Sequence, residues 1–125
     1  MDSDCPRGVL IVDDDLAVRE SLAEVLEDNE YCPVSVANGQ EALDYLRQGY
    51  KPCVILLDLM MPIMDGWEFR AAQLADPHLG PIPVIVLSAV NEIGRVAAGA
   101  VLRKPVQLET LLAAVQLFCA PLQAS

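Results

Sequence analysis

Five polar residues of this chain lie within two positions of the end of a short apolar run, and together they could perform phosphoryl chemistry. They are Asp13 and Asp14 after the first run, Asp58 after the third, Ser88 after the fourth and Lys104 after the fifth. Clustered carboxylates raise one another's pKa unless a cation lies among them. A hard divalent ion bound among the carboxylates would offset their repulsion, and Mg²⁺ fits such a site best. A hydroxyl and an ammonium group would suit phosphoryl oxygens. The pattern predicts phosphoryl transfer onto the Asp58 carboxylate as in-line nucleophile.

Each of these residues also has an ordinary structural interpretation. An Asp-Asp-Asp run most often caps a helix or forms a solvated turn, a serine after a strand is usually a turn residue, and Lys104 before a proline is normally a surface cation. The joint occurrence at successive strand ends is what favours a site.

The elements that must position these side chains alternate between strand and helix. Continuous apolar runs indicate buried strands, and 3.6-residue periodicity indicates helices. We expect strands at 8–12, 33–37, 54–57, 83–87 and 99–102, and helices at 16–27, 39–48, 66–75, 91–98 and 108–119. Such alternation predicts an α/β fold, a doubly wound five-stranded parallel sheet flanked by helices, with the fourth helix shortened. We expect a single domain over residues 1–125, with the polar strand ends along one edge of the sheet.

The composition excludes several classes of function. A net charge of −10 argues against direct nucleic-acid binding, which needs a basic footprint. No apolar stretch approaches 18 residues, and the amino terminus lacks the pattern of a signal peptide. We therefore expect a cytoplasmic protein without a membrane span.

The four cysteines lie far apart in the sequence. They are Cys5, Cys32, Cys53 and Cys119, and the chain has one histidine, His78. Without a Cys-x-x-Cys pair, this set argues against a zinc site. We expect free cysteines and no disulfide framework, with Cys32 and Cys53 packing as small apolar residues ahead of buried strands.

The sequence resembles the receiver domains of two-component response regulators over nearly its whole length. The motifs that carry the resemblance are Asp13-Asp14 after an apolar run, the block Asp58-Leu-Met-Met-Pro-Ile-Met-Asp-Gly66, Leu87-Ser88-Ala89 and Lys104-Pro105. The resemblance implies a CheY-like, flavodoxin-like (βα)5 fold, and a signalling domain that accepts phosphate from a histidine kinase or histidine phosphotransfer domain. The resemblance thus implies a phosphoacceptor and not a turnover enzyme.

The resemblance also implies a role for each site residue. Asp58 is the phosphoacceptor. Asp14, Asp58 and the Met60 carbonyl bind Mg²⁺ directly, and Asp13 acts largely through metal-bound water. Ser88 donates a hydrogen bond to a phosphoryl oxygen, and Lys104 pairs with another. A cis peptide before Pro105 is expected to aim Lys104 inward.

Several positions depart from the family pattern. Val101 stands where receivers usually carry a tyrosine or phenylalanine that swings inward on phosphorylation. Met60 and Val90 are both apolar, and we predict that they misorient attacking water, so that the phosphoryl group is long-lived.

Only sixteen positions separate Ser88 from Lys104, so the usual dimerisation face must be reduced. We expect a monomer that signals by ordering the loop 89–95. Ala17, Val18 and Ser21 on the first helix are candidate contacts for the phosphodonor, although they could equally be ordinary helix surface.

Two other functions remain open at this point. A Mg²⁺-dependent aspartyl-phosphate phosphatase would use Asp13-x-Asp15, but it needs a further acidic pair, and Glu109 is the only acid after Lys104. A pseudo-receiver would be an interaction module that never takes phosphate. Val101 and the short fourth helix favour it, whereas the complete set of acids, hydroxyl and lysine opposes it.

Overall fold

The computed structural model describes residues 5–89 and 99–119, which form one parallel sheet covered on both faces by helices. The strands are β1 (Gly8–Val12), β2 (Cys32–Val36), β3 (Val54–Asp58), β4 (Val84–Ser88) and β5 (Ala100–Arg103). The helices are α1 (Leu16–Asp28), α2 (Gly39–Arg47), α3 (Gly66–Ala75) and α4 (Leu108–Phe118). The expected helix at 91–98 and Val90 lie outside the described residues.

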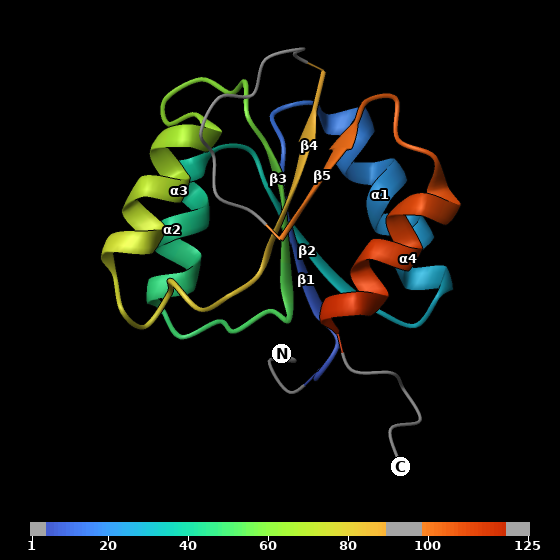
Figure 1. The fold of residues 1–125 in the computed structure, drawn as a ribbon, viewed down its shortest axis with the longest axis horizontal. Coiled ribbons are helices and arrows are strands. Elements are labelled where there is room, and N and C mark those ends of the chain that lie inside the picture. The colour runs from blue at the N-terminus through green and yellow to red at the C-terminus, as the bar shows by residue number, and fades with distance from the viewer. Residues whose placement is uncertain (1–4, 90–98, 120–125) are drawn as a thin grey trace.

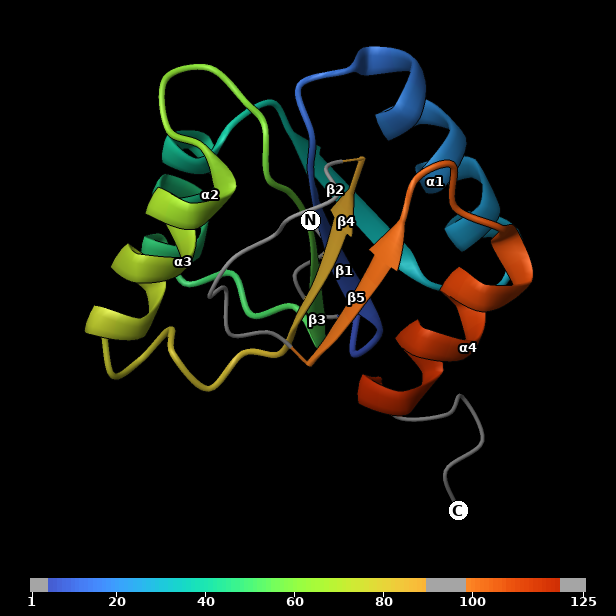
Figure 2. The same ribbon diagram turned by 45° about the horizontal axis from the view of Figure 1, so that its top comes forward.

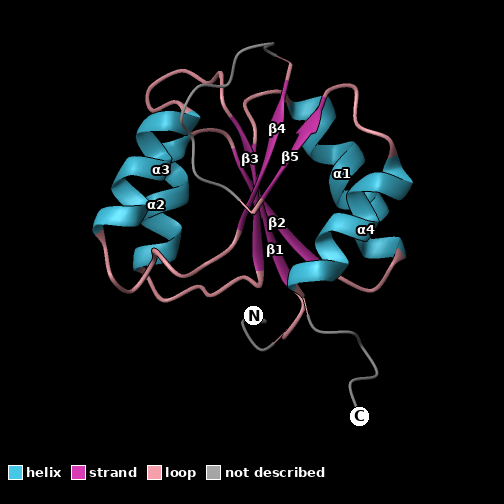
Figure 3. Cartoon of the chain, viewed as in Figure 1, coloured by secondary structure: helices cyan, strands magenta, loops and turns pink. Residues whose placement is uncertain are grey.

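The strand order β2-β1-β3-β4-β5 confirms the doubly wound topology, with β3 at the centre. Helices α1 and α4 cover one face of the sheet, and α2 and α3 cover the other (Figure 1, Figure 3). The tilted view in Figure 2 shows the twist of the sheet between these layers. No helix in the described part of the chain is long and apolar enough to cross a membrane.

The three inner strands are buried along their whole length, which explains their continuous apolar runs. Successive side chains point to opposite faces. Val9 and Ile11 therefore pack with the residues under α1 and α4. Leu10 and Val12 pack with those under α2 and α3. These two cores hold the carboxyl ends of β1, β3 and β4 in fixed register.

Side-chain caps fix the starts of three helices. Asp15 accepts from the backbone N–H groups of Ala17 and Val18 at the start of α1. Asn38 caps α2, and Asp65 forms a reciprocal capping box with Glu68 at the start of α3. Each cap lies close after a strand, so it sets where the chain turns back across the sheet.

The expectation of free cysteines was wrong, because the structure contains two disulfide bonds. Cys5 pairs with Cys32, and Cys53 pairs with Cys119. Cys32 and Cys53 lie at the amino-terminal ends of β2 and β3, and Cys119 follows the last turn of α4. The parallel topology gathers these points at one edge of the sheet, which linear spacing does not reveal.

Candidate functional site

The carboxyl-terminal edge of the sheet carries a group of three carboxylates, the acid cluster Asp13, Asp14 and Asp58. One oxygen from each lies within 4.8 Å of the others. Asp13 and Asp58 are buried, whereas Asp14 is exposed and opens the cluster to solvent. The donors are all carboxylate oxygens, which is the chemistry of a hard-cation site. The structure thus brings together the three acids that the sequence singled out.

Lys104 joins this cluster from the loop after β5. Its Nζ lies 2.9 Å from Asp13 Oδ2 and 3.3 Å from Asp58 Oδ1. Its backbone N–H donates to the Ser88 carbonyl at 2.9 Å, which ties the loop to the end of β4. The Lys104–Pro105 peptide is cis, as the family resemblance implied. The lysine is therefore held as a fixed cation between two buried carboxylates.

The charge state of Asp58 reflects opposing influences. Burial raises the pKa of its carboxyl, and the charge of Asp13 raises it further. Lys104 and a hydrogen bond from the Met60 backbone oppose that rise, but the net direction is upward. Burial alone would lower the pKa of Lys104, but the hydrogen bonds and charges of Asp13 and Asp58 outweigh it and raise that pKa. Relative to their ordinary pKa values, the surroundings thus favour the protonated form of Asp58 and the charged form of Lys104.

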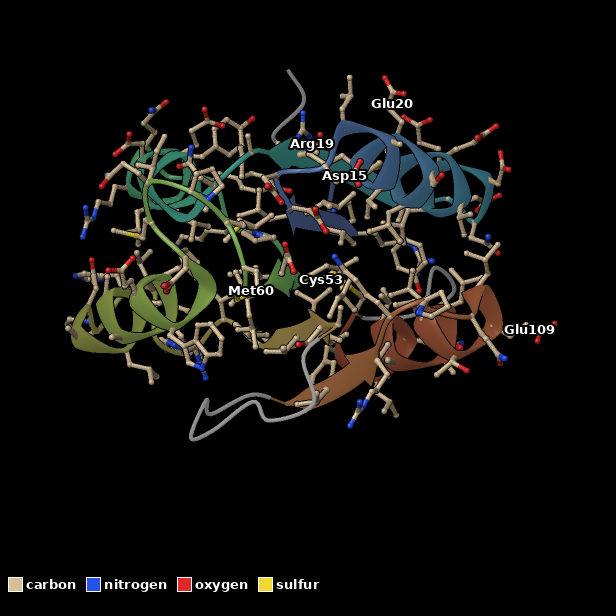
Figure 4. The ribbon with its side chains drawn as sticks, turned by 90° about the horizontal axis from the view of Figure 1, so that it is seen from above. Asp15, Arg19, Glu20, Cys53, Met60 and Glu109 are labelled. Atoms are coloured by element: carbon tan, nitrogen blue, oxygen red, sulfur yellow. A yellow bond between two sulfur atoms is a disulfide. The ribbon has the colours of Figure 1, made fainter. Side chains whose placement is uncertain are left out.

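Asp13 is fixed by groups that the sequence did not single out. Its Oδ1 accepts from the Asp15 N–H at 2.9 Å. The Arg19 guanidinium donates to the Asp13 carbonyl at 2.7 Å. Figure 4 looks onto this edge of the sheet and shows Asp15 and Arg19 together at the start of α1. Helical periodicity indicates which face of α1 is buried, but it does not show that the Arg19 side chain reaches back to the strand end.

The other two predicted residues lie at neighbouring strand ends. Ser88 is buried as the last residue of β4, and Asp58 pairs in register with Leu87. Met60 donates its backbone N–H to Asp58 while its side chain is 58% exposed. In Figure 4, Met60 lies on the side of the sheet edge away from Asp15 and the start of α1.

A close contact holds the loop between β3 and α3 against Asp58. The Gly66 N–H donates to the Leu59 carbonyl at 2.9 Å. A Cβ atom at Gly66 would lie only 2.5 Å from the Asp58 carbonyl oxygen. This approach therefore requires glycine.

The same loop contains a strained turn. The Met64 N–H donates to the Pro62 carbonyl at 2.7 Å, and Ile63 between them has a φ of 69°. This is a γ-turn with positive φ at its centre, a rare geometry for a β-branched residue. The Ile63 side chain is 81% exposed beside the site.

An apolar groove of about 300 Å³ lies next to Lys104, between α1 and the loop that leads into α4. Its lining includes the three helix residues predicted as partner contacts, Ala17, Val18 and Ser21. The rest of the lining comes from Leu22, Leu87, Lys104, Pro105, Val106 and Leu108. Lys104 is the residue that this groove shares with the site, since its Nζ also contacts Asp13 and Asp58.

The geometry does not favour the phosphatase alternative. Asp15 is occupied as the cap of α1, and among the described residues the carboxylate group contains Asp13, Asp14 and Asp58 without it. Glu109 lies on the outer side of α4 and points away from the cluster (Figure 4). Asp15 and Glu109, the acids that this alternative would add to Asp13, therefore lie outside the cluster.

Sequence comparison identifies the family. A family model described as the response regulator receiver domain matches residues 9–116. Response regulator Rre1 of Synechocystis sp. is 36% identical over 127 residues, which cover 96% of this chain and 54% of that protein. Response regulator MprA of Mycolicibacterium vanbaalenii is 40% identical over 114 residues, covering 86% and 48% respectively. The chain thus spans about half the length of these curated relatives.

Solved structures agree with this result. The signal receiver domain of a signal transduction histidine kinase from Syntrophus aciditrophicus superposes with a TM-score of 0.85 and 28% identity, covering 95% of this chain and 94% of that one. Vibrio cholerae chemotaxis protein CheY4 gives a TM-score of 0.81 and 30% identity, covering 90% and 98%. The fold, the ordered motifs and the sequence match together show that this chain belongs to the response regulator receiver domain family of two-component signalling.

Proposed function

We propose that this chain accepts a phosphoryl group on Asp58 in the presence of Mg²⁺ and passes the signal on through its phosphorylated form. The observation that carries the proposal is the meeting of three carboxylates with Lys104 at the carboxyl edge of the sheet. We treat residues 1–125 as one such domain. We expect it to act as a monomer in the cytoplasm, without direct contact to nucleic acid or membrane.

Each residue has a distinct task in this mechanism. A carboxylate oxygen of Asp58 forms a bond to phosphorus while the bond from phosphorus to the donor's imidazole nitrogen breaks. Lys104 already lies 3.3 Å from Asp58, so it is placed to neutralise a phosphoryl oxygen without reorganisation. Ser88 at the end of β4 would donate its hydroxyl to another phosphoryl oxygen.

The donor set fits Mg²⁺, since three carboxylates converge and one of them is exposed to solvent. Asp14, Asp58 and the Met60 carbonyl would hold the ion directly. Asp13 would act through metal-bound water, the role that the family resemblance implies for it, while its carboxylate oxygens accept hydrogen bonds from the Asp15 N–H and from Lys104. When bound, the ion would neutralise charge on the incoming phosphoryl oxygens.

The donor would be a histidine kinase or a histidine phosphotransfer domain, the partners with which receiver domains of this family interact. The apolar groove beside Lys104 is the surface that we assign to it. Docking there would place a phosphohistidine over the acid cluster. The chain would then be a phosphoacceptor that reacts once per signal.

Apolar groups around the site would protect the product. The exposed Met60 side chain lies at the rim of the cluster and offers no polar atom to orient water against the acyl phosphate. We therefore expect the isolated phosphoprotein with Mg²⁺ to survive for minutes or longer.

Val101 is 44% exposed on β5 and cannot make the usual aromatic swing, so a different element must report the phosphorylated state. We assign this task to the loop 89–95, most of which lies outside the described residues.

The test is incubation of the full chain with acetyl phosphate, a small phosphodonor that needs no docking surface, followed by intact-mass analysis. The wild type should gain one phosphoryl group with Mg²⁺ and none with EDTA. Asp58→Ala should gain none. Asp15→Asn is the matched control, because it changes a neighbouring acid that caps α1 outside the cluster, and it should be labelled like the wild type.

Labelling of Asp58→Ala at the wild-type level, or failure of the wild type to accept acetyl phosphate and to bind beryllofluoride with Mg²⁺, would contradict the proposal. The second result would favour the pseudo-receiver. Repeated turnover of a small phosphate ester would instead favour the phosphatase.

A further inference from the structure

Both disulfide bonds lie at the edge of the sheet opposite the acid cluster, where the proposed phosphoryl chemistry makes no use of them. Cys53 directly precedes β3, and Cys119 directly follows α4. We propose that Cys53 and Cys119 form a reversible dithiol–disulfide pair, a redox modification site that fastens the end of α4 to the start of the central strand. The chain would thereby respond to thiol–disulfide poise through a site separate from Asp58.

The structure accommodates both redox forms of this pair. The two Cα atoms are 5.2 Å apart, within the range of about 4.4–6.8 Å that a disulfide needs. The Cys53 sulfur also lies 3.1 Å from the Gly8 carbonyl oxygen. A disulfide sulfur has no proton to donate there, whereas a thiol could donate to that oxygen. Both cysteines pack against the apolar core under α1 and α4, where a free thiol behaves as a small apolar group.

The Cys53–Cys119 bond fastens α4, and the chain connects α4 to Lys104 in the site. The ring of Phe118, beside Cys119, lies so close to Gly99 that a Cβ atom there would be 2.6 Å from its Cζ. The end of α4 therefore braces the start of β5, and Lys104 lies in the connection between β5 and α4. Forming or breaking the bond at Cys119 therefore changes how firmly β5, α4 and the connection between them are held.

The reaction requires an oxidant of the low-molecular-weight disulfide class. Cys53 is the more accessible of the two, since Cys119 is only 2% exposed. The Cys53 thiolate attacks the oxidant, forming a mixed disulfide and releasing one small thiol. The Cys119 thiolate then attacks the Cys53 sulfur, which forms the intramolecular bond and releases the second small thiol. The two protein thiols lose two electrons and two protons, and the small disulfide is reduced to two thiols.

The other pair provides a matched control within the same chain. Cys5–Cys32 joins the segment before β1 to the start of β2. β2 and β5 are the two outer strands of the sheet, on opposite sides of it. Removing it leaves the connection between β3 and α4 in place. Any effect specific to α4 must therefore follow the Cys53–Cys119 pair.

The experiment equilibrates the full chain in glutathione buffers of graded reduced-to-oxidised ratio, then measures thiol alkylation by mass spectrometry and hydrogen exchange of α4. Three proteins are compared: the wild type, Cys53→Ser/Cys119→Ser, and Cys5→Ser/Cys32→Ser. In the wild type and in Cys5→Ser/Cys32→Ser, the 53–119 bond should form and break reversibly. Reduction should speed exchange in α4 by about tenfold or more, because local opening is then less costly.

In Cys53→Ser/Cys119→Ser, exchange in α4 should be fast and independent of the buffer. Free thiols at Cys53 and Cys119 in the most oxidising buffer would overturn the proposal. So would exchange in wild-type α4 that is the same in the oxidised and reduced forms. The wild-type measurement needs no substitution, so a variant that fails to fold does not remove the test.

Discussion

Asp58 is buried next to another carboxylate, and this placement costs folding free energy when both are ionised. Burial and the charge of Asp13 raise the pKa of Asp58 above its ordinary value of 3.8, against the opposing effect of Lys104. The folded state therefore holds the Asp58 proton more tightly than the unfolded chain does. The stabilisation from this proton is complete below the ordinary pKa and is lost as the pH rises through the folded-state value.

The first prediction follows from that sign. At pH 7 without divalent ions, Asp58→Asn should raise the free energy of unfolding by roughly 1 kcal/mol. The gain should shrink as the pH falls toward the ordinary pKa of aspartate. Urea unfolding over a series of pH values measures it. Asp15→Asn, which preserves the cap on α1, should change stability little, and equal effects of the two substitutions would refute the electrostatic explanation.

Ile63 stores strain beside the site. A β-branched residue at the centre of a γ-turn with φ of 69° is unfavourable, and its side chain is 81% exposed, so packing repays little of that strain. Ile63→Gly should raise the free energy of unfolding by about 1 kcal/mol, after the greater flexibility of glycine in the unfolded chain is allowed for. Ile63→Val keeps the strain and should show no such gain. A loss of stability in Ile63→Gly would mean that the isoleucine side chain makes a stabilising contact.

At the scale of elements, the loop between β3 and α3 depends on one close approach. A methyl group at Gly66 would meet the Asp58 carbonyl oxygen at 2.5 Å and the Leu59 Cα at 2.7 Å. Both neighbours are backbone atoms of a buried segment, so neither can move aside easily. This contact couples the position of α3 to the end of the strand that carries Asp58.

Gly66→Ala should therefore lower the free energy of unfolding by about 3 kcal/mol and weaken labelling by acetyl phosphate. Gly80→Ala is the control, because its nearest neighbour would lie at an ordinary 3.4 Å. Thermal unfolding of both variants provides the comparison. If Gly66→Ala were as stable as Gly80→Ala, the close packing of this loop could not be what positions Asp58.

At the scale of the whole molecule, the chain carries a net charge of −10, and three of its carboxylates lie together in the acid cluster. A bound divalent cation would relieve this repulsion and stabilise the folded state. We predict that Mg²⁺ at about 100 times its dissociation constant raises the free energy of unfolding by about 2.7 kcal/mol relative to NaCl of matched ionic strength. Asp14→Asn should lose most of this gain. A stabilisation equal to that of NaCl would indicate general screening and no specific site.

Much of this architecture could be predicted from the sequence, because buried parallel strands and their polar ends leave a direct pattern. The runs before Asp13, Asp58 and Ser88 gave β1, β3 and β4 to within a residue, and their ends meet as expected. The cysteine pairing could not be predicted, because residues as far apart as Cys53 and Cys119 meet only through the topology.

Two local features also escaped sequence analysis. The reach of Arg19 back to the Asp13 carbonyl depends on a side-chain conformation and not on periodicity. The turn at Ile63 was missed because a β-branched residue argues against positive φ.

The most direct measurement of the central claim is the position of the phosphoryl group itself. The chain is labelled with acetyl phosphate and Mg²⁺, the acyl phosphate is reduced with borohydride, and the modified residue is located by peptide mass spectrometry. The account predicts that residue 58, converted from aspartate to homoserine, is the one modified position. Modification at Asp13 or Asp14 instead, or an unmodified Asp58 in protein shown to carry phosphate, would contradict it.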